Sequence, residues 1–243
     1  MKINGKRIVI TGGTSGVGYE IVKQLYSRNE LIVISRSSSK LNELAKEFDS
    51  IVIYQADLSN LKDVETTADS IVNRFDSIDI LINNAASQHT PTFLDDDFNY
   101  QSISKEVTLN FTSICCLCYL LLPALLHKSK SVILNINSGL GLVPKRSSAV
   151  YCGTKGAINL FSQSLSYQLE DTSIDVQQAF LALVDTAMTA GRGKNKLTPA
   201  EAARMIIHGV EQDVAENNIG KVKLLRALLR ISPSLAKRIL KNT

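Results

Sequence analysis

The sequence predicts an α/β fold in which a single domain, residues 1–243, forms one doubly wound parallel sheet with helices on both faces. Two observations predict it. Short, branched and almost continuously apolar runs alternate with longer segments whose apolar residues recur every three or four positions. The connections between these runs are short, so right-handed crossovers are expected to join parallel strands. A chain of 243 residues with 44% hydrophobic side chains is large enough for one extended core.

The first half of the chain contains four expected strands, each of which is short and rich in branched residues: Arg7–Thr11, Leu31–Ser35, Ile51–Tyr54 and Asp79–Ile82. Between them lie three segments with helical spacing of apolar residues: Val17–Arg28, Ser39–Phe48 and Asn60–Phe75.

The second half continues the alternation. We expect a long apolar helix near Ile103–His127, a strand at Val132–Asn137, a helix near Ala149–Glu170 and a strand at Asp175–Phe180. Residues 187–198 contain a Gly- and Lys-rich stretch and are interpreted as a mobile loop on the substrate side, after which a helix begins at Pro199.

A glycine-rich turn directly follows the first strand and precedes a helix, in the stretch Thr11-Gly12-Gly13-Thr14-Ser15-Gly16-Val17-Gly18. Glycines permit a sharp turn and let the backbone approach a pyrophosphate, which then lies against the amides of the helix N-terminus. This context predicts a Rossmann-type dinucleotide site, with the cofactor contacted by Gly12, Thr14, Ser15, Gly16, Val17 and Gly18.

The end of the second strand bears on the choice of cofactor. Many NAD-binding proteins carry an acidic residue there, which binds the ribose 2′-hydroxyl and would repel a 2′-phosphate. This chain carries Ser35 and Arg36 instead, a hydroxyl followed by a planar cation. The pair favours NADP(H), with NAD(H) as the alternative and with an exposed arginine at the start of a helix as the interpretation without a ligand.

Tyr151 and Lys155 lie four residues apart at the start of an expected helix, hence on one face and one turn apart. A nearby ammonium and the positive nicotinamide of the oxidised cofactor are both expected to lower the high pKa of a tyrosine, so that Tyr151 can exchange a proton near neutral pH. Ser138, just after the fifth strand, can bond the same substrate oxygen and polarise a carbonyl.

The order of these motifs resembles that of the short-chain dehydrogenase/reductase family over about residues 5–190. The resemblance implies a Rossmann fold and catalysis by Asn110, Ser138, Tyr151 and Lys155, with Asn110 holding a water in a proton relay to the lysine. It implies cofactor contacts from further residues as well: Asp57, Leu58, Asn83, Ala85, Tyr151, Lys155 and Thr186.

Two positions depart from the family pattern. Ala86 replaces the last glycine of the Asn-Asn-Ala-Gly turn, so the backbone there must tolerate a Cβ atom. The Pro-Gly that usually follows the sixth strand is absent from Phe180–Thr186, which puts the path of that loop in question. The basic C-terminal tail lacks a glycine-rich last strand and is similar to that of the DltE-like bacterial branch.

Composition excludes other classes of function. The net charge of +4 is mild and unclustered, which argues against a nucleic-acid-binding protein. The N-terminal apolar run is too short for a signal peptide or a membrane span, so we expect a cytoplasmic protein. Three of the four cysteines crowd into one apolar segment without histidines at metal-ligand spacing, so no metal site is expected.

Three segments after strand ends are expected to border the substrate cleft: residues 87–98, 139–148 and 187–196. Their apolar side chains indicate a moderately apolar carbonyl or alcohol substrate. The apolar helices around Cys115 and Leu160 suggest a homodimer or homotetramer. Residues 221–243 form a basic amphipathic segment, for which packing on the core is favoured over contact with a membrane surface.

The sequence therefore predicts an NADP(H)-dependent oxidoreductase that interconverts a carbonyl and an alcohol, with Tyr151 as general acid and base. An NAD-linked alcohol dehydrogenase of the same fold is one alternative. A dinucleotide sensor without catalysis is another, but such a protein would typically have lost Tyr151 or Lys155, and both are present.

Overall fold

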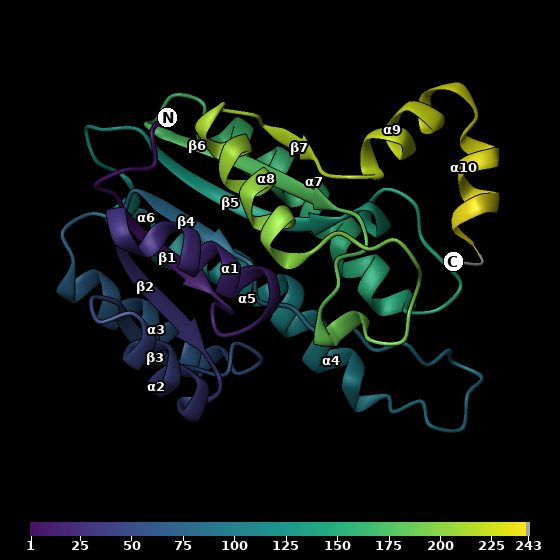
Figure 1. The fold of residues 1–243 in the computed structure, drawn as a ribbon, viewed down its shortest axis with the longest axis horizontal. Helices are drawn as coiled ribbons and strands as arrows, with labels where there is room; N and C mark the ends of the chain where they lie inside the picture. The colour runs from purple at the N-terminus through teal and green to yellow at the C-terminus, as the bar shows by residue number, and fades with distance from the viewer. Residues whose placement is uncertain (242–243) are drawn as a thin grey trace.

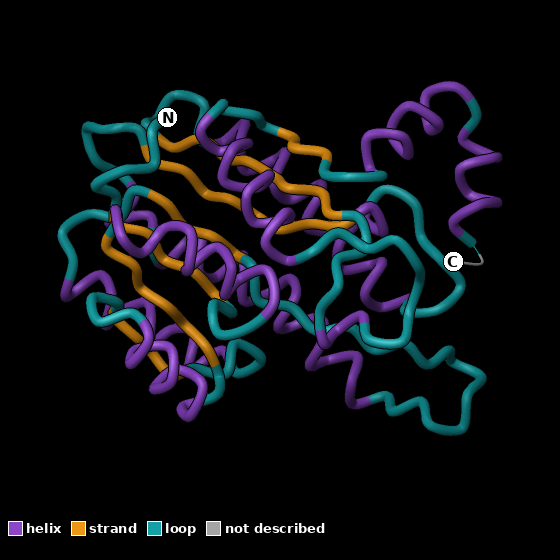
Figure 2. The backbone as a smooth tube through the Cα atoms, in the orientation of Figure 1, coloured by secondary structure: helices purple, strands orange, loops and turns teal. Residues whose placement is uncertain are grey.

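The computed structural model describes residues 1–241 and contains one seven-stranded parallel sheet in the order β3-β2-β1-β4-β5-β6-β7 (Figures 1 and 2). The strands are β1 (Arg7–Thr11), β2 (Glu30–Ser35), β3 (Val52–Gln55), β4 (Ile80–Asn83), β5 (Ser131–Ser138), β6 (Ile174–Leu181) and β7 (Glu216–Asn218). The order of strands reverses between β1 and β4. The predicted doubly wound, Rossmann-type α/β fold is confirmed.

Helices cover both faces of the sheet. One face carries α1 (Gly16–Leu25), α2 (Ser38–Glu47) and α8 (Pro199–Glu211). The opposite face carries α3 (Leu61–Arg74), α5 (Ser113–Leu120), α6 (Leu122–Leu125) and α7 (Ala149–Gln168). α4 (Gln101–Val107) continues towards α5 at the edge where the strands end (Figure 1).

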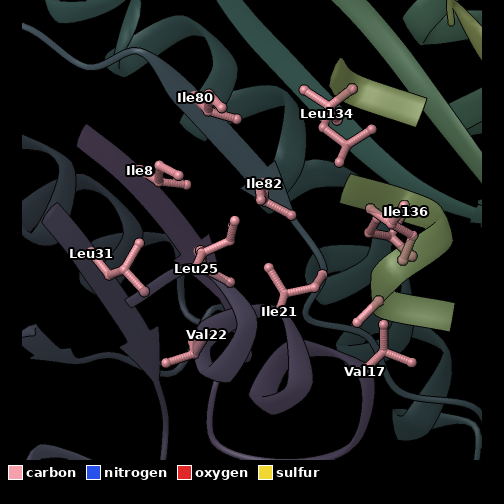
Figure 3. Close-up of a cluster of buried hydrophobic side chains, with 14 of the residues drawn as sticks. Ile8, Val17, Ile21, Val22, Leu25, Leu31, Ile80, Ile82, Leu134 and Ile136 are labelled. Carbon is pink, nitrogen blue, oxygen red and sulfur yellow. The ribbon is translucent and has the colours of Figure 1, made fainter. Parts of the chain in front are cut away.

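Alternate residues of each central strand enter two separate cores. In β1, Ile8 and Ile10 pack under α1, whereas Val9 packs under the helices of the other face. In the first core, Ile21 and Leu25 of α1 meet the β-branched residues of β1 and β4 (Figure 3). Burial of each such side chain contributes about 1.5–3 kcal/mol, so α1 is fixed against the strand ends that carry the site.

One helix that was predicted to be continuous is interrupted. The expected helix Ile103–His127 is divided into α4, a π turn at Thr108–Thr112, α5 and the short α6. Pro123 lies in the first turn of α6 and lacks the amide proton that a continuous helix requires. The π turn includes Asn110, whose side chain bonds outside the helix.

Strand β7 was not predicted, because its three residues, Glu216–Asn218, are polar and give no apolar signal. It pairs with β6 from Gln178 to Phe180 and occupies the edge of the sheet. Edge strands tolerate polar residues, since one side of the ladder is unpaired.

The basic C-terminal segment forms two helices, α9 (Val222–Ile231) and α10 (Pro233–Leu240), which lie beside the main body (Figure 1). Val222, Leu225 and Ala236 are buried, and Leu225 and Ala236 pack with Val143 of the loop after β5. The favoured packing on the core is thus present for the described part of the segment; residues 242–243 lie outside the described residues. Within residues 1–241, none of the helices has both the length and the apolar character that crossing a bilayer requires.

Candidate active site

The predicted site residues gather where the parallel strands end. The glycine turn follows β1, Ser35 ends β2, Asp57 follows β3, and Ser138 ends β5. Because all these strands run in the same direction, their carboxyl ends meet along one edge, and the reversal between β1 and β4 opens a crevice there.

The glycine turn has the conformation that a pyrophosphate site requires. Gly12 and Gly16 adopt positive φ angles of 69° and 56°, in the left-handed region that favours glycine. A Cβ atom on Gly18 would lie 2.2 Å from the carbonyl oxygen of Gly12, so only glycine lets α1 pack this close to the turn. Ser15 precedes α1 and makes no side-chain capping bond, which leaves the amides of the first turn without a side-chain acceptor.

Thr186 lies directly against this turn. A Cβ atom on Gly16 would be 3.1 Å from Cγ2 of Thr186, so the two residues face each other across the crevice. The chain after β6 is held in place by a short bridge between Val184 and Leu197 and by the capping box of Thr186 and Thr189. The loop therefore brings Thr186 to the cofactor groove without the usual Pro-Gly.

Ser35 and Arg36 lie at the mouth of the same groove. The hydroxyl groups of Ser35 and Thr14 are 2.9 Å apart, which ties the end of β2 to the glycine turn. The Arg36 side chain is 79% exposed, and its Nη1 atom lies 4.0 Å from Oδ2 of Asp57. An ion pair this long and exposed stabilises little, so the guanidinium is available to an anion.

Asp57 is held as a carboxylate. Although burial raises its pKa, hydrogen bonds from the hydroxyl and amide of Ser59 and the nearby charge of Arg36 together lower the pKa below its ordinary value. The neighbouring Leu58 is buried in the core, and so is Val17 of α1.

Thr11 and Asn84 join the ends of β1 and β4, and neither was predicted as a site residue. The Thr11 hydroxyl accepts hydrogen bonds from the amides of Asn84 and Ala85 at 2.9 and 3.0 Å. Nδ2 of Asn84 donates to the carbonyl oxygens of Thr11 and Gly12. Ala86 does not adopt a positive φ angle, so its Cβ atom is tolerated as expected.

The Asn83 side chain lies in the core, and a cofactor contact by this residue stays a prediction. Asn83 is buried, and its Nδ2 atom donates to Oδ1 of Asn135 at 2.9 Å. Asn135 in turn donates to the hydroxyl of Ser162 in α7. The side chain thus points into the core between β4 and α7, because alternate residues of a strand face opposite sides of the sheet.

The catalytic candidates Ser138, Tyr151 and Lys155 come together between the end of β5 and the first turns of α7. Tyr151 lies close enough to Ser138 for that hydroxyl to lower the pKa of the phenol, and the tyrosine is 8% exposed. Nζ of Lys155 lies over the Tyr151 ring, 5.7 Å from its centre, and donates to the carbonyl oxygen of Ile136 at 2.8 Å. This carbonyl lies in β5, so Lys155 also ties α7 to the sheet.

Burial sets the protonation states of Tyr151 and Lys155 in the protein without a bound cofactor. It raises the pKa of Tyr151 to about 12, against the lowering effect of the nearby Ser138 hydroxyl, and it lowers the pKa of Lys155 to about 8. The phenol is therefore protonated near neutral pH and poised to donate. The lowering of the Tyr151 pKa that we expect from the ammonium and from an oxidised nicotinamide concerns the complex with the cofactor and stays a prediction.

Asn110 is fully buried next to these residues. Its Oδ1 atom accepts from the amide of Ser87, and its Nδ2 atom donates to the carbonyl of Ser87 at 2.8 Å and to the hydroxyl of Thr154 at 3.3 Å. The side chain thus fixes the loop after β4 against α7. The proposed water relay stays a prediction.

Residues missed from the sequence support the start of α7. Ser148, which precedes α7, has a φ angle of 59°, and its hydroxyl accepts a hydrogen bond from Gln88 at 3.1 Å. Gln88 also accepts from Arg192 at 2.9 Å. The buried Glu106 accepts from the amide of His89. No repeat or motif marks these residues, because their contacts exist only after three loops meet.

A hollow at the opposite edge of the sheet is not a candidate site. It lies at the amino end of β1, where Lys6 pairs with Asp79 at 2.8 Å and Arg7 pairs with Glu30 at 2.7 Å. Lys6, Arg7, Glu30 and Asp79 already pair with one another there, and none of the catalytic candidates lines the hollow.

Comparison with known proteins agrees with this geometry. Residues 6–197 match the family described as short chain dehydrogenase. The chain is 30% identical over 237 residues to the uncharacterized oxidoreductase DltE of Bacillus subtilis, which covers 95% of this chain and 94% of that protein. It is also 30% identical over 229 residues to an NADP-dependent 3-hydroxy acid dehydrogenase of Schizosaccharomyces pombe, covering 85% of this chain and 87% of that protein.

A similar fold is found in a solved structure. A short chain dehydrogenase of Burkholderia cenocepacia in complex with NADP superposes with a TM-score of 0.89 over 100% of both chains, at 20% sequence identity. The match of residues 6–197 and the near full-length similarity to DltE decide the assignment: this chain belongs to the short chain dehydrogenase family of oxidoreductases, and it is similar to the DltE-like bacterial branch.

Proposed function

We propose that this protein interconverts a carbonyl and an alcohol with NADP(H), and that Tyr151 is the group that gives and takes the proton. One observation carries the proposal. The Tyr151 phenol is buried and protonated beside Ser138, at the same sheet edge as the glycine turn. A phenol in this position can meet a substrate oxygen while a dinucleotide occupies the groove.

The residues divide the chemistry of carbonyl reduction between them. Bound NADPH supplies the hydride that adds to the carbonyl carbon. Tyr151 donates its proton to the oxygen as the carbonyl π bond becomes a C–OH group. Ser138 donates a hydrogen bond to the same oxygen and stabilises the negative charge that develops there. In the reverse direction, Tyr151 must first be a phenolate, which burial opposes.

The preference for NADP(H) rests on Ser35 and Arg36. Arg36 is exposed at the mouth of the groove, and the Ser35 hydroxyl lies beside the glycine turn. A 2′-phosphate would accept hydrogen bonds from the Ser35 hydroxyl and the Arg36 guanidinium. These bonds would be stronger than the 4.0 Å contact between Arg36 and Asp57. The NADP named for the two related proteins supports the same choice.

Replacement of Tyr151 by Phe tests the proton donor. We expect Tyr151→Phe to lower kcat by about 100-fold or more, since a positioned general acid contributes about 10²–10⁴. Its NADPH affinity should change little. Tyr26→Phe is the matched control, because Tyr26 follows the far end of α1 and is 37% exposed. Ketones, aldehydes and alcohols are screened by nicotinamide absorbance. Full turnover by Tyr151→Phe would disprove the role.

A second pair of variants tests the cofactor. Arg36→Ala should weaken NADPH binding by about 10-fold or more and leave NADH binding nearly unchanged, because a charge-assisted hydrogen bond contributes about 1.5–3 kcal/mol. Lys46→Ala, an exposed change in α2, is the control. Equal NADPH affinity in Arg36→Ala and the wild type would favour the NAD-linked alternative. Binding without turnover of any compound by the wild type would favour the sensor.

The protein is also proposed to form a homodimer or homotetramer in the cytoplasm. Tyr119 of α5 and Leu160 and Tyr167 of α7 are 70% or more exposed on one side of the sheet. Large exposed apolar side chains on helices that also form the core are typical of subunit interfaces. Sedimentation of the wild type and of Leu160→Glu tests this: a smaller species in the variant is expected.

A further inference from the structure

Lys145 and Arg192 are two half-buried cations without a carboxylate partner. Neither forms an ion pair with any Asp or Glu side chain within residues 1–241. They lie close enough for Arg192 to add to the effect of burial in lowering the pKa of Lys145. Two like charges held together and partly removed from water are unfavourable unless an anion joins them.

Both cations belong to loops that border the crevice at the start of α7. Lys145 lies in the loop after β5, close enough to Cys152, the residue after Tyr151, for the two groups to interact electrostatically. The Arg192 guanidinium donates to Gln88 at 2.9 Å and to the carbonyl oxygen of Met188. Gln88 in turn donates to Ser148, the residue that precedes α7. Arg192 is therefore fixed by a short chain of hydrogen bonds to the helix that carries Tyr151.

Arg192 lies close enough to Tyr151 to influence its pKa. Burial raises the pKa of Tyr151, and Arg192 is one of the charged groups that act in the opposite direction. Glu106, an acid that acts on Tyr151 and raises its pKa, is buried, and burial raises the pKa of Glu106 itself. It accepts from the amide of His89 and forms no ion pair with either cation. Glu106 therefore does not neutralise Lys145 and Arg192.

We propose that the substrate carries a carboxylate, which binds between Arg192 and Lys145 while its carbonyl or hydroxyl group meets Tyr151 and Ser138. This inference rests on the proposed function and adds the class of substrate, an oxo or hydroxy acid. The planar guanidinium suits a carboxylate through paired hydrogen bonds, and the ammonium adds a point charge. Gln88 is a positioning residue, since it holds the guanidinium. The substrate would then combine the moderately apolar part expected from the loops with an anionic carboxylate.

Kinetics with matched acids and esters test the proposal. The substrates are acetoacetate and 3-oxohexanoate, each against its methyl ester, with NADPH. We expect the wild type to prefer each acid by about tenfold or more in kcat/KM. Arg192→Gln and Lys145→Gln should raise KM for the acids by about 10- to 100-fold. They should leave KM for the esters nearly unchanged. Lys194→Gln and Arg146→Gln are the controls, since both side chains are exposed on the same two loops.

A binding measurement separates this inference from the proposed function. Butanoate cannot be reduced, so its stabilisation of the NADP⁺ complex in thermal unfolding reports anion binding alone. We expect stabilisation of the wild type and of Lys194→Gln, and its loss in Arg192→Gln. If esters react as well as acids and butanoate has no effect, the carboxylate site is wrong and the oxidoreductase assignment stands. If butanoate binds through Arg192 but no oxo compound is reduced, the proposed function is wrong and the anion site stands.

Discussion

Replacement of Lys155 by Met tests how much the buried charge of Lys155 destabilises the native state. Met matches the unbranched stem of lysine without its charge. Lys155 is 3% exposed, and burial lowers its pKa from 10.5 to about 8. Each pKa unit corresponds to about 1.4 kcal/mol, so the buried charge destabilises the native state by about 3 kcal/mol at neutral pH. Loss of the hydrogen bond to Ile136 offsets about 1–3 kcal/mol of the gain.

The pH dependence gives a sharper signal than the net change. A lysine with a lowered native pKa destabilises the native state fully below that pKa, and the penalty disappears as pH rises towards the unfolded value. The free energy of unfolding of the wild type should therefore rise by about 2 kcal/mol relative to Lys155→Met between pH of about 7 and pH of about 9.5. Urea denaturation of both proteins at each pH measures it, and Lys223→Met, an exposed change in α9, is the control.

Two outcomes bear on the argument. Parallel stability curves for the wild type and Lys155→Met would show that the ammonium is not desolvated, and would refute the reasoning. The expected result is a variant that is less dependent on pH and loses turnover, because Tyr151 then lacks its cationic neighbour. Such a separation of stability from activity is common where an active site keeps a destabilising group.

Three further predictions follow from single contacts. Gly18→Ala should weaken NADPH binding and lower stability by about 1–3 kcal/mol, because the new Cβ atom meets the Gly12 carbonyl at 2.2 Å; fluorescence titration and urea denaturation measure both, and wild-type values would contradict the packing. Asn84→Ala should lower the free energy of unfolding by about 1–3 kcal/mol through loss of its bonds to Thr11 and Gly12, whereas an unchanged value would show that water replaces them. Burial raises the pKa of Cys118, and it raises the pKa of Cys115 to about 11. Both thiols should therefore react slowly with a disulfide reagent near neutral pH and rapidly after unfolding. Fast reaction of all four thiols in the native protein would contradict this.

The sequence predicted the fold well because most of its strands and helices carry a strong local signal. The β-branched runs at β1 and β2 and the apolar spacing of α1 and α3 require burial on both faces, which only a covered parallel sheet provides. Predictions were weaker where the signal comes from tertiary contacts. β7 is polar, and the interruption of the helix near Asn110 depends on bonds to Ser87 and Thr154.

The candidate site shows the same division. Ser138, Tyr151 and Lys155 were predicted from order and spacing, and the structure brings them together. The effect of burial on the pKa of Tyr151 could not be predicted from the sequence, because spacing shows that a cation is near but not how deeply both groups are buried. Residues such as Gln88 have no pattern in the sequence, since Gln88 joins two loops that are 60 and 104 residues away along the chain.

Buried polar residues join the sheet to α7 beneath the site, in an otherwise apolar core. Asn83 and Asn135 bond to each other across β4 and β5, and Asn135 bonds to Ser162 of α7. Lys155 bonds the same helix to β5 through the carbonyl of Ile136. Both contacts are directional, whereas apolar packing alone would let α7 slide or rotate by a fraction of a turn. Because Tyr151 must meet a substrate oxygen within hydrogen-bond distance of Ser138, a small rotation of α7 would separate the two hydroxyls. The buried polar bonds therefore lower the freedom of the helix at the point where the proposed chemistry requires a fixed geometry.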